Sequence, residues 1–201
     1  KRLLHEAVVL PQQCPSLFQG VRQPWKGILL YGPPGTGKTQ LAKAIAGESR
    51  ATFMLLSPSN LLSKFVGEAA ERALSRVFAF AKDKAPTCWS VEQIDAIGSS
   101  RGSGDQALRR LLAELLQQFS SLKPSDRVVV LAATNRIEDI DPALLRRFER
   151  KFHVGLLTGH ARGELLRLKM VGTPTAPDLD YKQLGRRTDG FSGASLELLC
   201  R

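Results

Sequence analysis

The sequence predicts an α/β fold in which helices cover a parallel sheet of five strands. Two observations favour it: apolar runs alternate with helical patterns along most of the chain, and one of these runs leads through a glycine-rich loop into a helix. Right-handed connections bring the carboxyl ends of such strands to one edge, where ligands bind. After Gly155 the pattern is wholly helical, so we expect an α/β domain over residues 1–155 and the start of a small helical lid, incomplete at its C-terminus, over residues 156–201.

The individual elements follow from local patterns. A first helix is expected over residues 3–10 and should end before Pro11, because proline cannot continue a helix. The expected strands are residues 27–31, 52–56, 86–91, 127–133 and 151–154, of which the fourth is an unbroken apolar run typical of a doubly covered strand. Apolar spacing near 3.6 predicts a helix over residues 68–84, and the lid should hold helices over residues 160–171, 179–187 and from 193 onward.

The loop after the first strand carries the strongest chemical signal. Residues 32–39 read GPPGTGKT, which matches the phosphate-binding pattern GxxxxGK[ST] between a strand and a helix. Its glycines let backbone N–H groups surround a polyphosphate at a helix N-terminus, Lys38 can reach the β and γ oxygens, and the Thr39 hydroxyl can hold Mg²⁺. The sheet is therefore of the P-loop NTPase type, and a nucleoside triphosphate should bind to Pro34, Gly35, Thr36, Gly37, Lys38, Thr39 and Gln40.

Composition limits the remaining classes. A chain of 201 residues with 43% hydrophobic content can bury a core, no run approaches the ~18 apolar residues of a membrane span, and no secretory signal is evident. Cys14, Cys88 and Cys200 are widely spaced and form no zinc or disulfide pattern, so no metal site is expected there. A net charge of +10 favours an acidic partner without choosing among peptide, nucleic acid and membrane, and a solvated basic face is the alternative.

Further segments carry a family resemblance. Together with the P-loop, LAATNR at residues 131–136, DPALLRRF at 141–148 and TDGFSGA at 188–194 make almost the whole chain resemble the AAA ATPases. Within that family it is similar to the meiotic clade: the ESCRT-disassembling vacuolar protein sorting ATPase, katanin, spastin and fidgetin. PWKGILLY at 24–31, HAR at 160–162, VGTP at 171–174 and LGRRTDG at 184–190 point to the ESCRT member first, although katanin shares the first of these.

The resemblance implies roles for single residues. Asn135 would be the sensor that hydrogen-bonds the γ-phosphate or the attacking water, unless it only caps a turn. Arg146 and Arg147 would be arginine fingers that reach a neighbouring protomer's nucleotide and neutralise charge on the γ-phosphate. Without the family match these arginines would be read as a solvated helix end. Gly193 and Ala194 would contact the nucleotide from the lid.

Two loops are expected to line a central pore. In SKFVGE, residues 63–68, the resemblance implies that Lys64, Phe65 and Val66 project into a hexamer channel and grip an extended polypeptide. An exposed phenylalanine beside glycine suits an intercalating wedge, whereas the alternative is that Phe65 belongs to the core. A second pore loop would fall over residues 98–106, where the sequence is short for it.

The family's second acidic motif is altered. It ends in Asp-Glu, whose Asp supports Mg²⁺ through water and whose Glu is the general base, but here the positions hold Glu92 and Gln93. An amide cannot accept a proton at neutral pH, and losing a general base typically slows the chemical step by about 10²–10⁴-fold. Nucleotide binding should survive. Natural impairment, an engineered ATP trap, and Glu92 acting as a displaced base with its extra methylene all remain open.

These observations predict a Mg²⁺- and ATP-binding AAA ATPase that assembles as a ring, a homo-hexamer or a mixed ring, and grips polypeptide in its pore. Its task would be disassembly of ESCRT-III filaments through their tails, with microtubule severing through tubulin tails as the alternative. Another class of interpretation is a pseudoenzyme that uses ATP as structural glue. No stable nucleic-acid partner is expected, because 6% aromatics offer no stacking platform. The expected location is cytoplasmic, endosome-associated or cytoskeletal, with membrane contact only through partners.

Overall fold

The computed structural model describes residues 2–18, 20–58, 68–98 and 106–201. It divides into two compact units: Lys1–Tyr31 with Thr39–Phe152, and Gly32–Lys38 with His153–Arg201. Within the described residues, no helix is both long and apolar enough to cross a bilayer.

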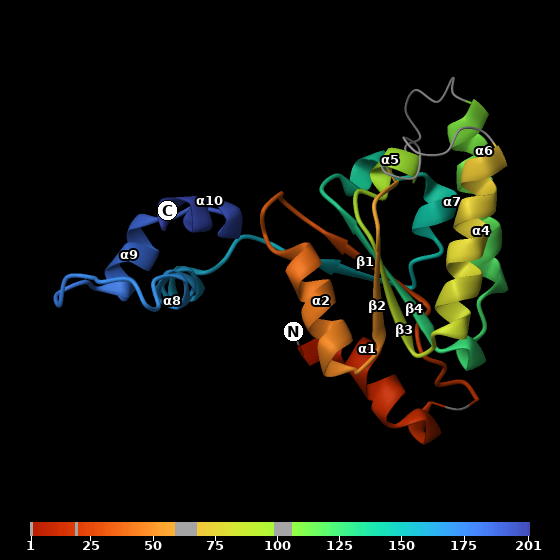
Figure 1. Cartoon of the computed structure of the whole chain (residues 1–201), viewed down its shortest axis with the longest axis horizontal. Coiled ribbons are helices and arrows are strands. Elements are labelled where there is room, and N and C mark those ends of the chain that lie inside the picture. Colours follow the sequence, from red (N-terminus) through yellow and green to blue (C-terminus); the bar gives the residue numbers. More distant parts are fainter. Residues whose placement is uncertain (1, 19, 59–67, 99–105) are drawn as a thin grey trace. The chain divides into compact units, whose positions relative to one another are not determined.

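The first unit is built on a five-stranded parallel sheet, which confirms the predicted fold class. The strand order is β2-β3-β4-β1-β5 (Figure 1). The strands are β1 (Gly27–Tyr31), β2 (Thr52–Leu56), β3 (Thr87–Val91), β4 (Val128–Thr134) and β5 (Arg150–His153). In the centre, Val130 of β4 pairs with Gly27 on one side and Trp89 on the other. Every residue of β3 and β4 is buried, as expected of central strands in a doubly covered sheet.

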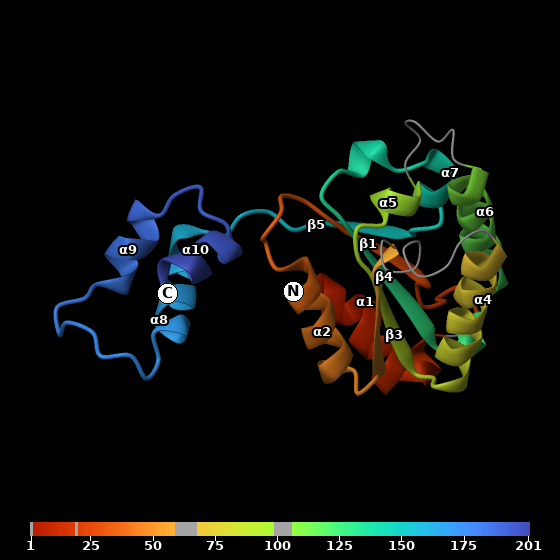
Figure 2. The same ribbon diagram turned by 45° about the horizontal axis from the view of Figure 1, so that its top comes forward.

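Helices cover both faces of this sheet. In Figures 1 and 2, α4 and α6 lie against one face and α1 and α2 against the other. The helices of this unit are α1 (Arg2–Gln13), α2 (Lys38–Glu48), α4 (Glu68–Asp83), α5 (Asp95–Gly98), α6 (Gln106–Ser121) and α7 (Pro142–Leu145), with short 3₁₀ turns η1 (Pro15–Leu17), η2 (Pro124–Asp126) and η3 (Ile137–Asp139).

Two helices differ from the sequence prediction. Helix α1 does not end before Pro11 but continues through it to Gln13, and the Cys14 amide still donates to the Leu10 carbonyl at 2.8 Å. A proline in the last turns removes only one hydrogen bond, and here its ring is buried against the unit. Helix α6 is absent from the sequence prediction, although its buried residues Leu111, Leu115 and Phe119 recur every four positions.

The core between the sheet and α4 and α6 contains a chain of aromatic rings. Trp89 of β3 is fully buried and meets Phe78 of α4 edge-on at 4.4 Å between ring centroids. Phe119 continues the chain at 6.2 Å from Phe78 and 5.4 Å from Phe148. Such edge-to-face pairs stabilise beyond area burial, so the indole that replaces an aliphatic strand residue is well packed. Among the described residues, however, neither its Nε1 nor the Ser90 hydroxyl has a hydrogen-bond partner.

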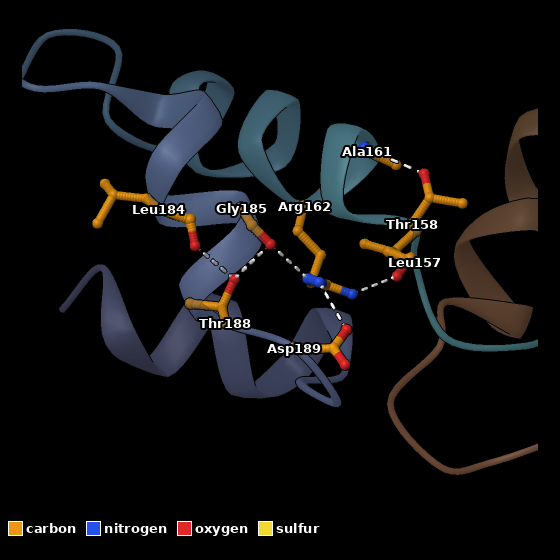
Figure 3. Close-up of polar contacts among 8 residues, drawn as sticks. All are labelled: Leu157, Thr158, Ala161, Arg162, Leu184, Gly185, Thr188 and Asp189. Carbon is orange, nitrogen blue, oxygen red and sulfur yellow. Dashed lines mark hydrogen bonds and ion pairs between the residues drawn. The ribbon is translucent and has the colours of Figure 1, made fainter.

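The second unit packs three helices around one buried arginine. These are α8 (Gly159–Lys169), α9 (Tyr181–Arg187) and α10 (Gly193–Leu199). Figure 3 shows Arg162 of α8 donating to three oxygens: the Leu157 carbonyl at 2.7 Å, the Gly185 carbonyl at 3.0 Å and the Asp189 carboxylate at 2.8 Å. Since its side chain is only 5% exposed, these bonds compensate a buried charge and tie α8 to α9 and to the turn before α10.

Candidate functional site

The glycine-rich loop has the backbone that its sequence predicts. Gly35 and Gly37 have φ angles of +73° and +89°, a region that favours glycine. A side chain at Gly35 would lie 2.8 Å from the Ser192 hydroxyl and 3.0 Å from Cβ of Ala194, and the Ala194 amide donates to the Gly35 carbonyl at 3.1 Å. The structure therefore brings the predicted lid residues Gly193 and Ala194 to the P-loop within the second unit.

Lys38 is held inside the loop. Its ammonium donates to the Gly32 carbonyl at 2.9 Å and the Pro33 carbonyl at 2.8 Å, and the residue is 8% exposed. Burial lowers the pKa of Lys38 from its ordinary value. The Thr36 hydroxyl also donates to the Pro33 carbonyl, at 2.9 Å. The other predicted nucleotide-binding residues Pro34, Gly37 and Gln40 are exposed.

Thr39 and Glu92 meet in the first unit. Thr39 follows Lys38 in helix α2, and Glu92 directly follows strand β3. The Thr39 hydroxyl donates to a carboxylate oxygen of the half-buried Glu92. Both groups are hard oxygen ligands of the kind that Mg²⁺ prefers, so the donor set of this pair fits the predicted metal. The extra methylene of Glu92, relative to aspartate, does not prevent the contact.

Gln93 occupies an unusual backbone position. It is exposed, with φ of +50°, and its carbonyl accepts from the Ala96 amide at 2.9 Å. A non-glycine residue in the left-handed region is uncommon and is found more often at functional sites than elsewhere. At this position an amide side chain can donate to and accept from water but cannot take its proton.

Asn135 lies at the exposed tip of β4, and its two neighbours are fixed by a buried hydroxyl. The Thr134 side chain donates to the Asp95 carboxylate at 2.7 Å and accepts from the Arg136 amide at 2.9 Å. Thr134 and Asp95 were not predicted as functional residues. The signal in the sequence is a threonine that ends an apolar strand and an aspartate two residues after Gln93.

Arg146 and Arg147 follow the short helix α7, and the structure places them together just after its end. The helix begins with Pro142, and the Asp141 carboxylate caps it by accepting from the Ala143 amide at 2.7 Å. Both arginines are exposed.

The remaining predictions concern the pore loops and the cysteines. Lys64, Phe65 and Val66 lie outside the described residues, as does most of the proposed second pore loop. The three cysteines are free thiols, and burial raises the pKa of Cys88 to about 12. In the part of the chain that the structure describes, no three His, Cys, Asp or Glu side chains form a metal-binding group.

Comparison with known proteins agrees with this geometry. The family "ATPase family associated with various cellular activities (AAA)" matches residues 28–156. The A-like 1 form of the katanin p60 ATPase-containing protein is 44% identical in both Rattus norvegicus and Homo sapiens, over 100% of this chain and 43% of each relative. The A1 form of the katanin p60 protein from Strongylocentrotus purpuratus is also 44% identical, with 40% of its length covered.

A solved structure titled "Structural Basis for Katanin Self-Assembly" superposes with a TM-score of 0.85 at 42% identity, covering 100% of this chain and 65% of that one. The chain thus spans less than half the length of these curated relatives. The similarity supports the katanin alternative and not the ESCRT-disassembling member that the short sequence segments place first. Those segments are too short to separate neighbouring branches of one clade.

Proposed function

Because the chain belongs to the AAA family of ATPases, we propose that it is the ATP-binding module of a katanin-like, microtubule-severing ATPase whose hydrolytic step is slowed by Gln93. The hydrogen bond from Thr39 to Glu92 supports this proposal, because it joins two oxygen ligands of the kind that Mg²⁺ prefers, beside the position where glutamine replaces the general base of the family pattern. The sequence therefore contains the residues expected for nucleotide binding, whereas Gln93 replaces one residue expected for hydrolysis.

Nucleotide binding would use the P-loop. The Lys38 ammonium would exchange the Gly32 and Pro33 carbonyls for phosphate oxygens, which are stronger acceptors because they are charged. The backbone amides of the loop would donate to the same phosphates. The Thr39 hydroxyl and, through water, the Glu92 carboxylate would hold Mg²⁺, which when bound neutralises charge on the phosphates. Gly193 and Ala194 would contact the nucleotide from the α10 side of the P-loop.

Hydrolysis would depend on three further positions. Asn135 would orient the attacking water or the γ-phosphate, and Arg146 with Arg147 would act on the nucleotide of a neighbouring copy in a ring. Gln93 would orient the water without accepting its proton. Glu92 is the nearest carboxylate in sequence, but its oxygen already accepts from Thr39. We therefore expect slow turnover, with Glu92 as a displaced base only if turnover proves normal.

The experiment is single-turnover ATP hydrolysis with matched variants. Gln93→Glu restores a carboxylate and should speed the chemical step by about 10²–10⁴-fold while ATP affinity stays unchanged. Gln93→Asn is the control, because asparagine tolerates the left-handed backbone but supplies no base, and it should give no gain. Equal rates for the native chain and Gln93→Glu would refute the slowed step and show that Glu92 or another group supplies the base.

The partners follow from the relatives and from charge. We propose a six-membered or mixed ring, a cytoskeletal location, and tubulin tails as the polypeptide, since a net charge of +10 suits an acidic tail. The second candidate is a pseudoenzyme that uses ATP only to hold a ring together, and Gln93 is the observation that favours it. Assembly that requires ATP but persists without any measurable turnover would distinguish it from a slow motor.

A further inference from the structure

A buried hydroxyl, that of Thr134, links the segments that follow the two neighbouring strands β3 and β4. Thr134 is 1% exposed at the end of β4, and its hydroxyl acts both as a donor and as an acceptor. It donates to the Asp95 carboxylate at 2.7 Å and accepts from the Arg136 amide at 2.9 Å. Asp95 belongs to the segment after β3 and Arg136 to the turn after β4, so one hydroxyl joins two separate loops.

Backbone hydrogen bonds also join these two segments. The Ile94 amide donates to the Ala133 carbonyl at 3.1 Å, which joins the residue after Gln93 to the residue before Thr134. The Ala96 amide closes the other side by donating to the Gln93 carbonyl at 2.9 Å. The backbone at Gln93 is thus connected by hydrogen bonds to strand β4 just before the turn that bears Asn135.

We propose that Asp95 and Thr134 are positioning residues that hold Asn135 in register with the Glu92–Gln93 segment, and that this clamp sets the preference of the site for ATP over ADP. Asn135 lies between Thr134 and Arg136, and the Arg136 amide is bonded to the Thr134 hydroxyl. Losing that bond frees the turn on both sides of Asn135. Only ATP has the γ-phosphate that this side chain would contact, so ATP affinity falls and ADP affinity does not. The clamp rests on the proposed nucleotide-binding function.

The first test compares ATP and ADP affinities of the whole chain in the presence of Mg²⁺. Thr134→Val keeps the shape of the side chain but removes the hydroxyl, and it should lower the ratio of ATP to ADP affinity by about tenfold, the value of one hydrogen bond to a charged group. Thr134→Ser keeps the hydroxyl and should retain the native ratio. Asp95→Ala should reproduce the effect of Thr134→Val.

A matched control separates positioning from stability. Thr87 is equally buried, at 1% exposed, and donates to the Ala81 and Lys84 carbonyls at 2.8 and 2.9 Å. It lies at the opposite end of β3 from Glu92. Thr87→Val should therefore lower the melting temperature as Thr134→Val does, yet leave the affinity ratio unchanged. If both valine variants keep the native ratio, Thr134 is only structural and the clamp is refuted.

A double-mutant cycle tests whether the effect passes through Asn135. Asn135→Ala should lower the ratio by itself, and adding Thr134→Val should then lower it by less than about twofold, because coupled residues are not additive. Fully additive losses would overturn the clamp while leaving nucleotide binding, and hence the proposed function, intact.

A final readout does not depend on nucleotide. Hydrogen exchange of the Arg136 amide should speed up at least about tenfold in Thr134→Val but not in Thr87→Val. Unchanged exchange would refute the clamp directly. If instead the native chain binds no nucleotide while its Arg136 amide behaves as expected, the proposed function fails and the clamp's effect on nucleotide preference fails with it, whereas the structural link itself stands.

Discussion

At the level of single residues, Glu92 and Gln93 determine which chemistry is possible at the end of β3. Glu92 contacts Thr39 although its side chain is longer than that of aspartate, because glutamate can rotate about one additional single bond. Gln93 has no comparable substitute: no rotamer gives an amide a basic oxygen. We therefore expect the substitution that changes side-chain shape least, glutamine in place of glutamate, to affect hydrolysis most.

Lys38 should be essential for nucleotide binding. Lys38→Met keeps the length of the stem but removes the donor that phosphate needs, so ATP should bind about 10- to 100-fold more weakly. Lys43→Met, on the exposed face of the same helix, is the control and should bind normally. Isothermal titration calorimetry measures both, and native affinity in Lys38→Met would contradict the P-loop assignment.

Cys88 should be inert in the folded protein. Burial raises its pKa from 9.0 to about 12, so the folded state keeps a proton that the unfolded state loses as the pH rises above 9. The unfolded state thus binds fewer protons than the folded state between pH 9 and pH 12. The contribution of the Cys88 thiol to the free energy of unfolding is therefore fully present below pH 9 and declines toward pH 12. At a pH of about 8, iodoacetamide should label Cys14 and Cys200 but not Cys88.

The alkaline part of this prediction uses Cys88→Ala. Between a pH of about 8 and one of about 10 the native chain should lose about 1 kcal/mol more unfolding free energy than the variant, since one pKa unit corresponds to about 1.4 kcal/mol. Urea unfolding at the two pH values measures the difference. Equal losses would show that the thiol does not titrate differently on unfolding.

At the scale of elements, glycine positions determine how closely the helices of the second unit approach. A side chain at Gly185 of α9 would collide with the Gly159 carbonyl and lie 2.8 Å from the Gly163 amide. The neighbours are backbone atoms and cannot rotate away. Helices α8 and α9 therefore pack at a distance that only glycine permits, and Arg162 then bonds across the contact.

Gly185→Ala should destabilise this unit by about 1–3 kcal/mol through overpacking. Gly47→Ala is the control: nothing lies within 4 Å of the added methyl in α2, and alanine favours helix by about 0.5–1 kcal/mol. Hydrogen exchange should accelerate in α8 and α9 for the first variant and in neither helix for the second. Protection of α8 in Gly185→Ala would contradict the close packing.

At the level of the whole molecule, the proposed ring would let Arg146 and Arg147 act on the nucleotide of a neighbouring protomer. In the Gln93→Glu background, replacing both with alanine should leave ATP affinity intact and slow turnover by about 10³-fold or more, because arginine fingers stabilise charge that develops only in the transition state. Arg76→Ala, an exposed arginine on α4, should retain full turnover. Normal turnover without the pair would argue against catalysis across an interface between protomers.

The strands and the glycine-rich loop could be predicted from local patterns in the sequence. The apolar run of β4 and the glycine loop before α2 depend on neighbouring residues, so fold class and P-loop followed directly. Local rules failed where packing overrode them: α1 continues through Pro11, whose ring is buried. Helix α6 is not among the elements predicted from the sequence, although its buried residues repeat every four positions: the predicted pore loop covers residues 98–106, and no element is predicted between it and β4.

Residue type and spacing along the chain were sufficient to predict the parallel α/β fold, the glycine-rich loop before α2, and an amide, Gln93, where the family pattern has its general base. Three contacts are evident only in the folded chain: Thr39 with Glu92, Thr134 with Asp95, and Ala194 with Gly35. The first two pairs are separated by 53 and 39 residues along the chain. Such contacts depend on strand order and helix packing, which place distant residues together without leaving any periodic trace between them.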